Sequence, residues 1–411
     1  MKEKFSSYQL FVVVLLAFLQ FTVILDFMML SPLGAILIAE LNITPPQFGR
    51  VVSAYAFSAG ASGLLAAGFA DRFDRKKLLL FFYVGFLGGT LLCGVADSYR
   101  FLLFARVVTG LFGGVIGSIG FAIIADLFPL SMRGRVMGLV QTSMAASQLL
   151  GIPFSLFLAN RWGWHAPFLL IVGIGIAAGV VMVFRLEPLT THLAAAATRN
   201  PIAHLVKTAT RPRYMAGFGA TMLLATGGFM LMPFGSTFLV QNLTISIDKL
   251  PLIYMVTGLA SIFAGPLLGR AADAFGKYRV FFVGTLIGMA VVIYFTRLGP
   301  VPLWLVIVIN VVLFAAITAR MVGSFALNSA LPDLPDRGAF MSISSSLQQL
   351  SGGVAAWCAG LIVHQATPTS PLENYPLLGT VVTVTMLITL VVMYRVNAIV
   401  QADTPAAAPS R

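Results

Sequence analysis

Long apolar runs alternate with short polar segments along the whole sequence. Twelve runs reach the length of about 20 residues that a membrane-spanning helix needs. They occupy residues 9–38, 47–70, 77–96, 101–125, 136–159, 166–185, 214–240, 250–272, 279–297, 302–329, 339–364 and 375–396. The pattern therefore predicts an all-α membrane protein with twelve transmembrane helices.

One long polar segment, residues 186–213, separates the first six runs from the last six, and it is basic and contains three prolines. We therefore expect an N-terminal six-helix bundle over residues 1–190, a cytoplasmic linker over 191–213 and a C-terminal six-helix bundle over 214–397. Residues 398–411, with repeated Ala and Pro, have the composition of a disordered tail.

The composition supports this interpretation. Hydrophobic residues make up 58 % of the chain and charged residues 10 %, whereas about a quarter of the residues in soluble domains are charged. Cys93 and Cys358 lie inside apolar runs and imply no disulfide framework. No small-residue cleavage site closes the first run, so we expect an uncleaved first helix rather than a signal peptide.

The distribution of Lys and Arg predicts the orientation. With the N-terminus inside and the spans alternating, a few cations fall in outer segments or within spans: Arg50, Arg100, Arg161, Lys249 and Arg297 outside, and Arg106 and Arg320 within spans. The remaining 19 of the 26 lie inside, which follows the positive-inside rule. We expect a multi-pass protein of the inner (cytoplasmic) membrane with both termini in the cytoplasm. This topology explains the net charge of +12, which in a soluble chain would suggest nucleic-acid binding.

A densely charged stretch, residues 67–77, lies between two apolar runs and has a counterpart at residues 269–279. Asp71 in the first copy and Asp273 in the second are 202 residues apart, about half of the chain. A charged hairpin repeated at this spacing suggests a transporter built from two similar halves. The alternative is two ordinary cytoplasmic loops that follow the positive-inside rule.

The first copy resembles the loop signature of the major facilitator superfamily, Gly-x-Leu-Ala-Asp-Arg-x-Gly-Arg-Lys. It matches at Ala70, Asp71, Arg72, Arg75 and Lys76 and departs at Ala67, Phe69 and Asp74, while the second copy keeps Gly269, Ala272, Asp273, Gly276 and Lys277. The resemblance implies the fold of this family, in which twelve transmembrane helices form two pseudo-symmetric six-helix bundles.

The same resemblance implies a cytoplasmic gate, made here by Asp71, Arg72, Arg75, Lys76, Asp126, Arg133 and Asp273. Asp71 is expected to cap the eleventh helix near Arg337, because a helix N-terminus favours an anion. Arg75 is expected to pair with Asp126, with Arg133 close by and Asp74 as a competitor. These contacts would stabilise the outward-facing state.

Three ionisable residues lie deep in predicted spans, where charge is costly: Asp26, Arg106 and Arg320. Arg106 is six residues from Arg100, or roughly 9 Å at 1.5 Å per residue, which places it at about the depth of Asp26. Burial disfavours a charged carboxylate and a nearby arginine favours it. We therefore expect Asp26 and Arg106 to form a proton-coupling pair, and the alternative is a static structural ion pair.

Further resemblances point to the drug:proton antiporters of this superfamily. The stretch from Leu25 to Pro32 is similar to their first-helix signature, and Arg106 begins a stretch similar to their fourth-helix signature, whose arginine is implicated in proton coupling. Gly151-Ile152-Pro153-Phe154 departs from their fifth-helix signature, and His165 replaces an arginine in the loop before the sixth helix.

Polar residues within the spans are candidates for a substrate cavity: Gln148, Asn310, Arg320, Gln348 and Gln349. Uncharged side chains of this kind also form hydrogen bonds between helices, and the sequence does not separate the two uses. Arg320 is only 17 residues before Arg337, so it should lie nearer the inner surface than Arg106. It either faces an anionic group or extends toward the inner surface.

Other chemistry finds no support in the sequence. The four histidines have no metal-ligand spacing, no phosphate-binding loop of the Walker type is present, and no catalytic triad or carboxylate pair indicates an enzyme. We expect a monomeric secondary transporter without cofactor or metal, which exports small amphipathic molecules in exchange for protons. Its partners would be a small-molecule substrate, protons and the lipid bilayer, but not nucleic acid. Alternatives are a proton-coupled uptake symporter and a non-transporting receptor of the same fold.

Overall fold

The computed structural model describes residues 5–69, 72–190, 201–333 and 336–403. Within these ranges the regular structure is helical, and the β pairing is a single isolated bridge between His364 and Glu373. The predicted all-α fold is therefore confirmed. The part before residue 191 contains α1 (Ser7–Met29), α2 (Gly34–Glu40), α3 (Pro45–Phe69), α4 (Arg75–Gly94), α5 (Tyr99–Leu127), α6 (Leu130–Ala146), a π-helical turn (Ser147–Gly151), α7 (Ile152–Trp162) and α8 (Ala166–Arg185).

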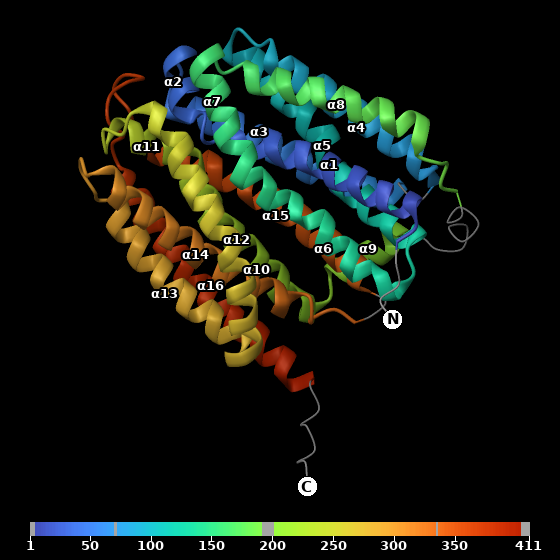
Figure 1. The fold of residues 1–411 in the computed structure, drawn as a ribbon. Coiled ribbons are helices and arrows are strands. Elements are labelled where there is room, and N and C mark those ends of the chain that lie inside the picture. The colour runs from blue at the N-terminus through green and yellow to red at the C-terminus, as the bar shows by residue number, and fades with distance from the viewer. Residues whose placement is uncertain (1–4, 70–71, 191–200, 334–335, 404–411) are drawn as a thin grey trace.

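A short helix, α9 (Pro201–Ala209), follows. The second half then contains α10 (Pro212–Leu231), a 3-10 turn (Met232–Phe234), α11 (Gly235–Gln241), a second 3-10 turn (Ile247–Lys249), α12 (Leu250–Phe275), α13 (Lys277–Phe295), α14 (Leu303–Asn328), α15 (Arg337–Ile362) and α16 (Tyr375–Asp403). The two halves form two helical bundles that lie side by side (Figure 1).

Each of the twelve predicted spans coincides with a helical segment. Ten such segments among the described residues are long and apolar enough to cross a membrane. The other two, α3 and α15, have 25 and 26 residues, which is enough length to span the membrane.

Three spans are interrupted, and each interruption lies at or next to a proline. The first span breaks at a turn that contains Pro32, the seventh at the 3-10 turn that contains Pro233, and the fifth at the π-turn that precedes Pro153. A proline lacks the N–H that a continuous helix needs, so breaks of this kind are expected beside it.

Two predictions about the polar segments were wrong in part. The segment 186–213 was expected to be a loop, but it contains α9, which begins at Pro201 because proline is favoured in the first turn of a helix. The tail was expected to start at residue 398, but α16 continues to Asp403, and residues 404–411 lie outside the described residues.

The two halves contact each other mainly where α3 packs along α15, and where α12 packs against α7 and the π-turn. The approach of α3 to α15 is close enough that a Cβ atom on Gly49 would lie 2.8 Å from the carbonyl oxygen of Ala356. A larger residue at this position would force the helices apart.

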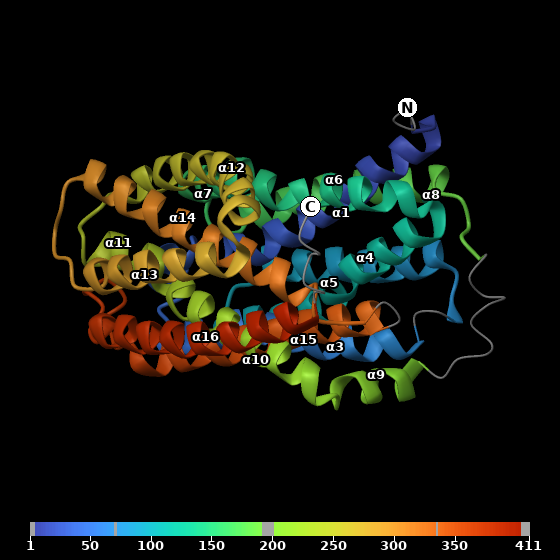
Figure 2. The same cartoon turned by 90° about the horizontal axis from the view of Figure 1, so that it is seen from below.

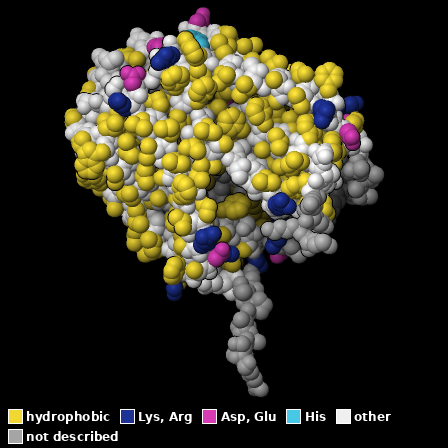
Figure 3. Space-filling model, in the orientation of Figure 1, with side chains coloured by type: hydrophobic (Ala, Val, Ile, Leu, Met, Phe, Trp, Pro, Cys, Tyr) yellow, Lys and Arg dark blue, Asp and Glu magenta, His cyan; other side chains and the backbone are white. Residues whose placement is uncertain are grey.

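One end of the molecule is closed by contacts between the halves, and we call it the α2–α11 end. There the Ser236 hydroxyl donates to the carbonyl of Ser31 at 2.9 Å, and the Phe48 and Phe234 rings meet edge to face at 6.0 Å. Away from this end, α12 contacts α6 much less than it contacts α7. Figure 3, drawn in the orientation of Figure 1, shows a hollow near the centre of the face toward the viewer. The hollow lies between the positions of α6 and α12 in Figure 1.

Candidate functional site

The Asp26 carboxylate lies in the core of the N-terminal bundle, one turn before the break in the first span. Its side chain is completely buried. Thr90 of α4 donates a hydrogen bond from Oγ1 to Asp26 Oδ1 at 3.2 Å, and Arg106 of α5 donates from Nη1 to Asp26 Oδ2 at 2.7 Å. The two residues that the sequence placed at similar depth are therefore in direct contact, and three helices meet at this carboxylate.

The Arg106 guanidinium is also buried, and its surroundings were not predicted. Its Cζ atom lies 4.5 Å from the centroid of the Tyr55 ring of α3, a distance typical of a cation–π contact. Its Nε and Nη2 atoms have no hydrogen-bond partner among the described residues. The cation is thus held by one carboxylate and one aromatic face, and two of its nitrogens remain available to another acceptor.

The backbone around the pair is tightly packed. Gly89 of α4 lies against α5, where an added Cβ atom would come within 2.6 Å of the Thr109 amide nitrogen. The Thr109 hydroxyl donates a hydrogen bond to the Ala105 carbonyl of its own helix at 2.7 Å. This approach of α4 to α5 places Thr90 and Arg106 on the same carboxylate.

A buried ion pair of this kind responds strongly to a change of charge. Removing one partner of a buried pair leaves an uncompensated charge and costs about 3–5 kcal/mol. Protonation of Asp26 removes one charge in the same way and would leave Arg106 to find another anion. The ionisation of Asp26 therefore decides whether the contact between α1 and α5 is an ion pair.

The gate contact predicted between Arg75 and Asp126 is present. Arg75, the first residue of α4, places Nε 3.2 Å from Asp126 Oδ2 near the end of α5, and the Arg75 side chain is 6 % exposed. Arg133 lies at the same place and donates to the carbonyls of Phe128 at 2.9 Å and Ala125 at 2.6 Å. These carbonyls at the end of α5 would otherwise lack partners, so Arg133 closes that helix end.

The other gate residues have different positions. Asp74 caps α4, and its Oδ1 accepts from the Lys76 amide at 2.9 Å and from the Leu189 amide at 3.0 Å. The Lys76 ammonium donates to the Val183 carbonyl at 2.9 Å. Arg72 and Asp273 are exposed at the ends of their hairpins. Asp71 lies outside the described residues, so its expected contact with α15 stays a prediction.

The substrate-cavity candidates are spread over three segments. Gln148 lies in the π-turn beside α12, with its backbone carbonyl near Gly258. Asn310 of α14 donates to the Val306 carbonyl of its own helix at 2.9 Å. Gln348 is exposed on α15 and Gln349 is half-buried there. None of the described hydrogen bonds joins any of these four side chains to another of them, so their grouping into one cavity stays a prediction.

Arg320 is buried, with 3 % of its surface exposed. Its Cζ atom lies 5.9 Å from the centroid of the Phe281 ring, and its Nε and Nη2 atoms have no hydrogen-bond partner among the described residues. Arg320 lies beside Gly284, seven residues into α13. It is therefore nearer than Arg106 to the end of the molecule opposite the α2–α11 end, which we call the α9 end, as the sequence predicted. Whether Arg320 faces an anionic group or extends toward the inner surface stays a prediction.

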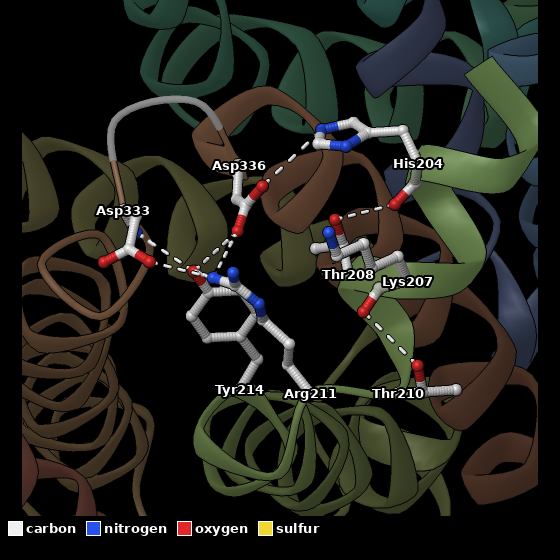
Figure 4. Close-up of polar contacts among 8 residues, drawn as sticks. All are labelled: His204, Lys207, Thr208, Thr210, Arg211, Tyr214, Asp333 and Asp336. Atoms are coloured by element: carbon white, nitrogen blue, oxygen red, sulfur yellow. Dashed lines mark hydrogen bonds and ion pairs between the residues drawn. The ribbon is translucent and has the colours of Figure 1, made fainter. Parts of the chain in front are cut away.

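A cluster around Arg211 was not predicted at all (Figure 4). Arg211 Nη1 lies 2.8 Å from Asp333 Oδ2 and 2.7 Å from Asp336 Oδ2, and the Tyr214 hydroxyl donates to Asp336 Oδ2 at 2.9 Å. On the other side of Asp336, the His204 Nε2 atom of α9 is 3.7 Å from Oδ1. The pair of acids spaced three residues apart, Asp333 and Asp336, was the available signal in the sequence.

We call this cluster the linker cluster (His204, Arg211, Tyr214, Asp333 and Asp336). His204 is its member in α9, and Arg211 follows the end of α9 by two residues. Besides these contacts, α9 packs against both α15 and α3. Figure 2 shows α9 alongside these two helices. Because α3 belongs to the first half and α15 to the second, α9 touches both sides of the interface between the halves.

These observations define a class of protein: a polytopic helical transporter with two bundles and a buried ion pair. The chain belongs to the Major Facilitator Superfamily, whose sequence profile matches residues 16–223 and 217–410. It is thus a multi-pass membrane transporter of this family, not an enzyme. The predicted family resemblance and the major facilitator fold are confirmed.

Individual relatives are distant. The chain is 28 % identical over 268 residues to "Uncharacterized MFS-type transporter YceJ" of Bacillus subtilis. This alignment covers 64 % of this chain and 67 % of the relative. It is 25 % identical over 268 residues to "Probable sugar efflux transporter" of Helicobacter pylori, covering 65 % and 66 %. It is 32 % identical over 129 residues to "Multidrug resistance protein 3" of B. subtilis, covering 31 % and 25 %. These matches span about two thirds or less of each relative.

Solved structures share the fold over nearly the whole chain. A bacterial homologue of the human lysosomal transporter Spinster superposes with a TM-score of 0.78 at 16 % identity, covering 98 % of this chain and 100 % of that one. A peptide transporter, POT, superposes with a TM-score of 0.72 at 15 % identity, covering 94 % and 95 %. At these identities the likeness concerns the fold.

Proposed function

We propose that the protein is a proton-coupled secondary transporter that exports small amphipathic molecules. The observation that carries the proposal is the buried contact of Asp26 with Arg106 and Thr90. Charge inside a membrane bundle is costly and usually functional. A single carboxylate held by one arginine offers a site where a proton can replace the ion pair.

The coupling follows from the competition between the proton and the arginine. In the ionised form Asp26 holds Arg106, and α1 stays attached to α5 through this contact. In the protonated form the attraction is lost, and Arg106 is free to bind another group. A ligand shifts a conformational equilibrium only through different affinities for the two states, and this switch supplies such a difference.

The arrangement of the halves supports alternating access. Contacts between Ser236 and Ser31 and between Phe234 and Phe48 close the α2–α11 end. The weaker contact of α12 with α6 and the hollow in Figure 3 fit a cavity that opens toward the opposite end. The substrate would then bind between an N-terminal bundle over residues 1–190 and a C-terminal bundle over 214–397. A single chain contains both bundles, so we propose a monomer.

The distribution of charge supports the orientation. Nineteen of the 26 cations belong to segments that alternate to one side, so we place the α9 end and both termini in the cytoplasm and the protein in the inner membrane. Export as the direction is supported by relatives whose names refer to sugar efflux and multidrug resistance.

A flux assay in proteoliposomes tests the proposal. Purified protein is reconstituted with an imposed pH gradient, and a panel of labelled sugars and amphipathic cations is followed in both directions. The proposal predicts substrate movement opposite to proton movement, abolished when the gradient is collapsed by a protonophore. Substrate movement in the same direction as protons would establish the uptake symporter instead, and binding without any flux would establish the receptor.

A further inference from the structure

A basic pocket lies in the C-terminal bundle at the α9 end, where α13 begins, α14 ends and α15 begins. It has a volume of about 390 Å³. Its lining includes the cations Lys277 and Arg337, the hydroxyl residue Ser329, and the apolar residues Ala326, Ala330 and Met341. Lys277 and Arg337 are both exposed, so their charged groups can reach a ligand at the surface. None of these residues belongs to the ion pair of Asp26 and Arg106.

The N-terminal bundle shows how a cation at the corresponding place is neutralised. Lys277 begins α13 as Arg75 begins α4, 202 residues earlier, which is also the spacing between Asp71 and Asp273. Arg75 is paired with Asp126, but 202 residues after Asp126 the chain has Asn328. Asn328 directs its amide to Thr221 Oγ1 at 3.2 Å. The C-terminal bundle therefore keeps the cation and lacks its acid.

Three carboxylates near the pocket among the described residues, Asp273, Asp333 and Asp336, do not replace that acid. Asp333 and Asp336, which precede Arg337, are bound to Arg211 of the linker cluster at 2.8 and 2.7 Å (Figure 4). Asp273 is exposed four residues before Lys277. No ion pair of Lys277 or Arg337 is present within the part of the chain that the structure describes.

Helix geometry adds to the positive character of the pocket. Lys277 is the first residue of α13, which has 19 residues, and Arg337 is the first residue of α15, which has 26. Each helix N-terminus carries a partial positive charge from its unpaired N–H groups. Two cations and two helix N-termini thus converge on one pocket, which also contains the C-terminal end of α14. Apart from Ser329, the remaining lining residues are apolar.

We propose that this pocket binds the headgroup of an anionic phospholipid from the adjacent membrane leaflet. The phosphate would lie between the Lys277 ammonium and the Arg337 guanidinium. The Ser329 hydroxyl, which donates to the Ala326 carbonyl at 3.2 Å in the structure, would turn to donate to the phosphate instead. The volume fits a headgroup but not acyl chains, which would continue past Met341 along the outside of the bundle. Basic pockets between transmembrane helices at the cytoplasmic side bind anionic lipids in this manner.

Lipid titration of the detergent-purified full-length protein tests the proposal. Dioleoylphosphatidylglycerol, dioleoylphosphatidylcholine and inorganic phosphate are each added, and the midpoint of thermal unfolding is followed. We expect the anionic lipid to raise the midpoint more than the zwitterionic lipid or free phosphate does. In the double variant K277Q/R337Q, the concentration of anionic lipid that gives half of the stabilisation should rise by about 30-fold. This factor corresponds to about 1 kcal/mol of attraction to anionic lipid for each of the two cations.

The matched control is R270Q/R279Q, which removes two exposed cations at the same end that do not line the pocket. It should keep the response of the unmodified protein, and the charge-conserving variant K277R/R337K should keep it too. An equal response of K277Q/R337Q and the unmodified protein would overturn the proposal. An equal response to inorganic phosphate and to the anionic lipid would overturn the assignment to lipid. The assay measures no transport, so its result is independent of the proposed proton coupling.

Discussion

Arg106 holds Asp26 through one hydrogen bond, from Nη1 to Oδ2 at 2.7 Å, in a buried site. Thr90 occupies the other carboxylate oxygen at 3.2 Å. Both donors favour the ionised carboxylate over the protonated one, since a protonated oxygen accepts less strongly. We therefore expect both donors to influence the pH dependence of the proposed transport.

Replacement of Thr90 by Val should move the pH dependence of transport. The variant keeps the shape of the side chain and removes one donor to the ionised carboxylate. The pH dependence of transport should therefore differ from that of the unmodified protein, because a hydrogen bond to a charged group contributes about 1.5 kcal/mol or more. The measurement is initial flux against pH in proteoliposomes. Thr109→Val is the control, because Thr109 donates to the Ala105 carbonyl, and its profile should match the unmodified protein.

A charge exchange tests the gate contact between Arg75 and Asp126. Arg75→Asp and Asp126→Arg should each lose most transport, because each replaces the opposite charges of a largely buried contact by two like charges. The double exchange restores an opposite pair and should recover part of the activity. Arg72→Gln, which alters an exposed neighbour, should transport nearly normally. Transport equal to the unmodified protein in both single variants would show that the contact is dispensable.

Loss of the Arg211 side chain should loosen the C-terminal end of α9, because Arg211 follows that helix by two residues and is bound to Asp333 and Asp336. Arg211→Gln leaves Asp333 and Asp336 facing each other without their shared cation. We expect faster hydrogen exchange in residues 201–209, at least about threefold, because a local opening needs less free energy once contacts are removed. Lys207→Gln changes an exposed cation of the same helix and should leave the exchange unchanged. Equal exchange in both variants would mean that packing on α15 and α3 alone holds α9.

Single-cysteine labelling tests the orientation. In a background without Cys93 and Cys358, cysteines at Lys77 and Lys207 should resist a membrane-impermeant thiol reagent in intact cells. Cysteines at Lys249 and Arg297 should react with it. Both groups should react after the membrane is permeabilised, which controls for accessibility. Labelling of position 77 or 207 in intact cells would reverse the assigned topology.

The sequence predicted the helices and the central pair because the signals there are strong. Twelve apolar runs dominate the chain, and Asp26 and Arg106 stand out because charge is rare inside spans. The contact between Arg75 and Asp126 came from a family signature. Because charged residues are costly inside a membrane span, the few that occur there point to the candidate site.

The remaining features depend on how the helices rotate and pack. Thr90 and Tyr55 are two of many similar residues, and only the approach of α3, α4 and α5 brings them to Asp26 and Arg106. The helix α9 is short and amphipathic, with nine residues. Its apolar positions are too few to stand out in a segment that contains three prolines. Pro233 lies at a break in the seventh span. The apolar run at this place continues without interruption, so hydropathy alone does not predict the break.

The measurement that tests the central claim most directly is transport by Asp26→Asn in proteoliposomes with and without a pH gradient. Asparagine mimics the protonated carboxyl, so the variant should still bind substrate and exchange it across the membrane without energy. It should fail to accumulate substrate against its gradient at any pH. A static ion pair predicts a less stable protein whose remaining transport still follows the proton gradient. Gradient-driven accumulation by Asp26→Asn, at a rate that scales with folded protein, would contradict the account.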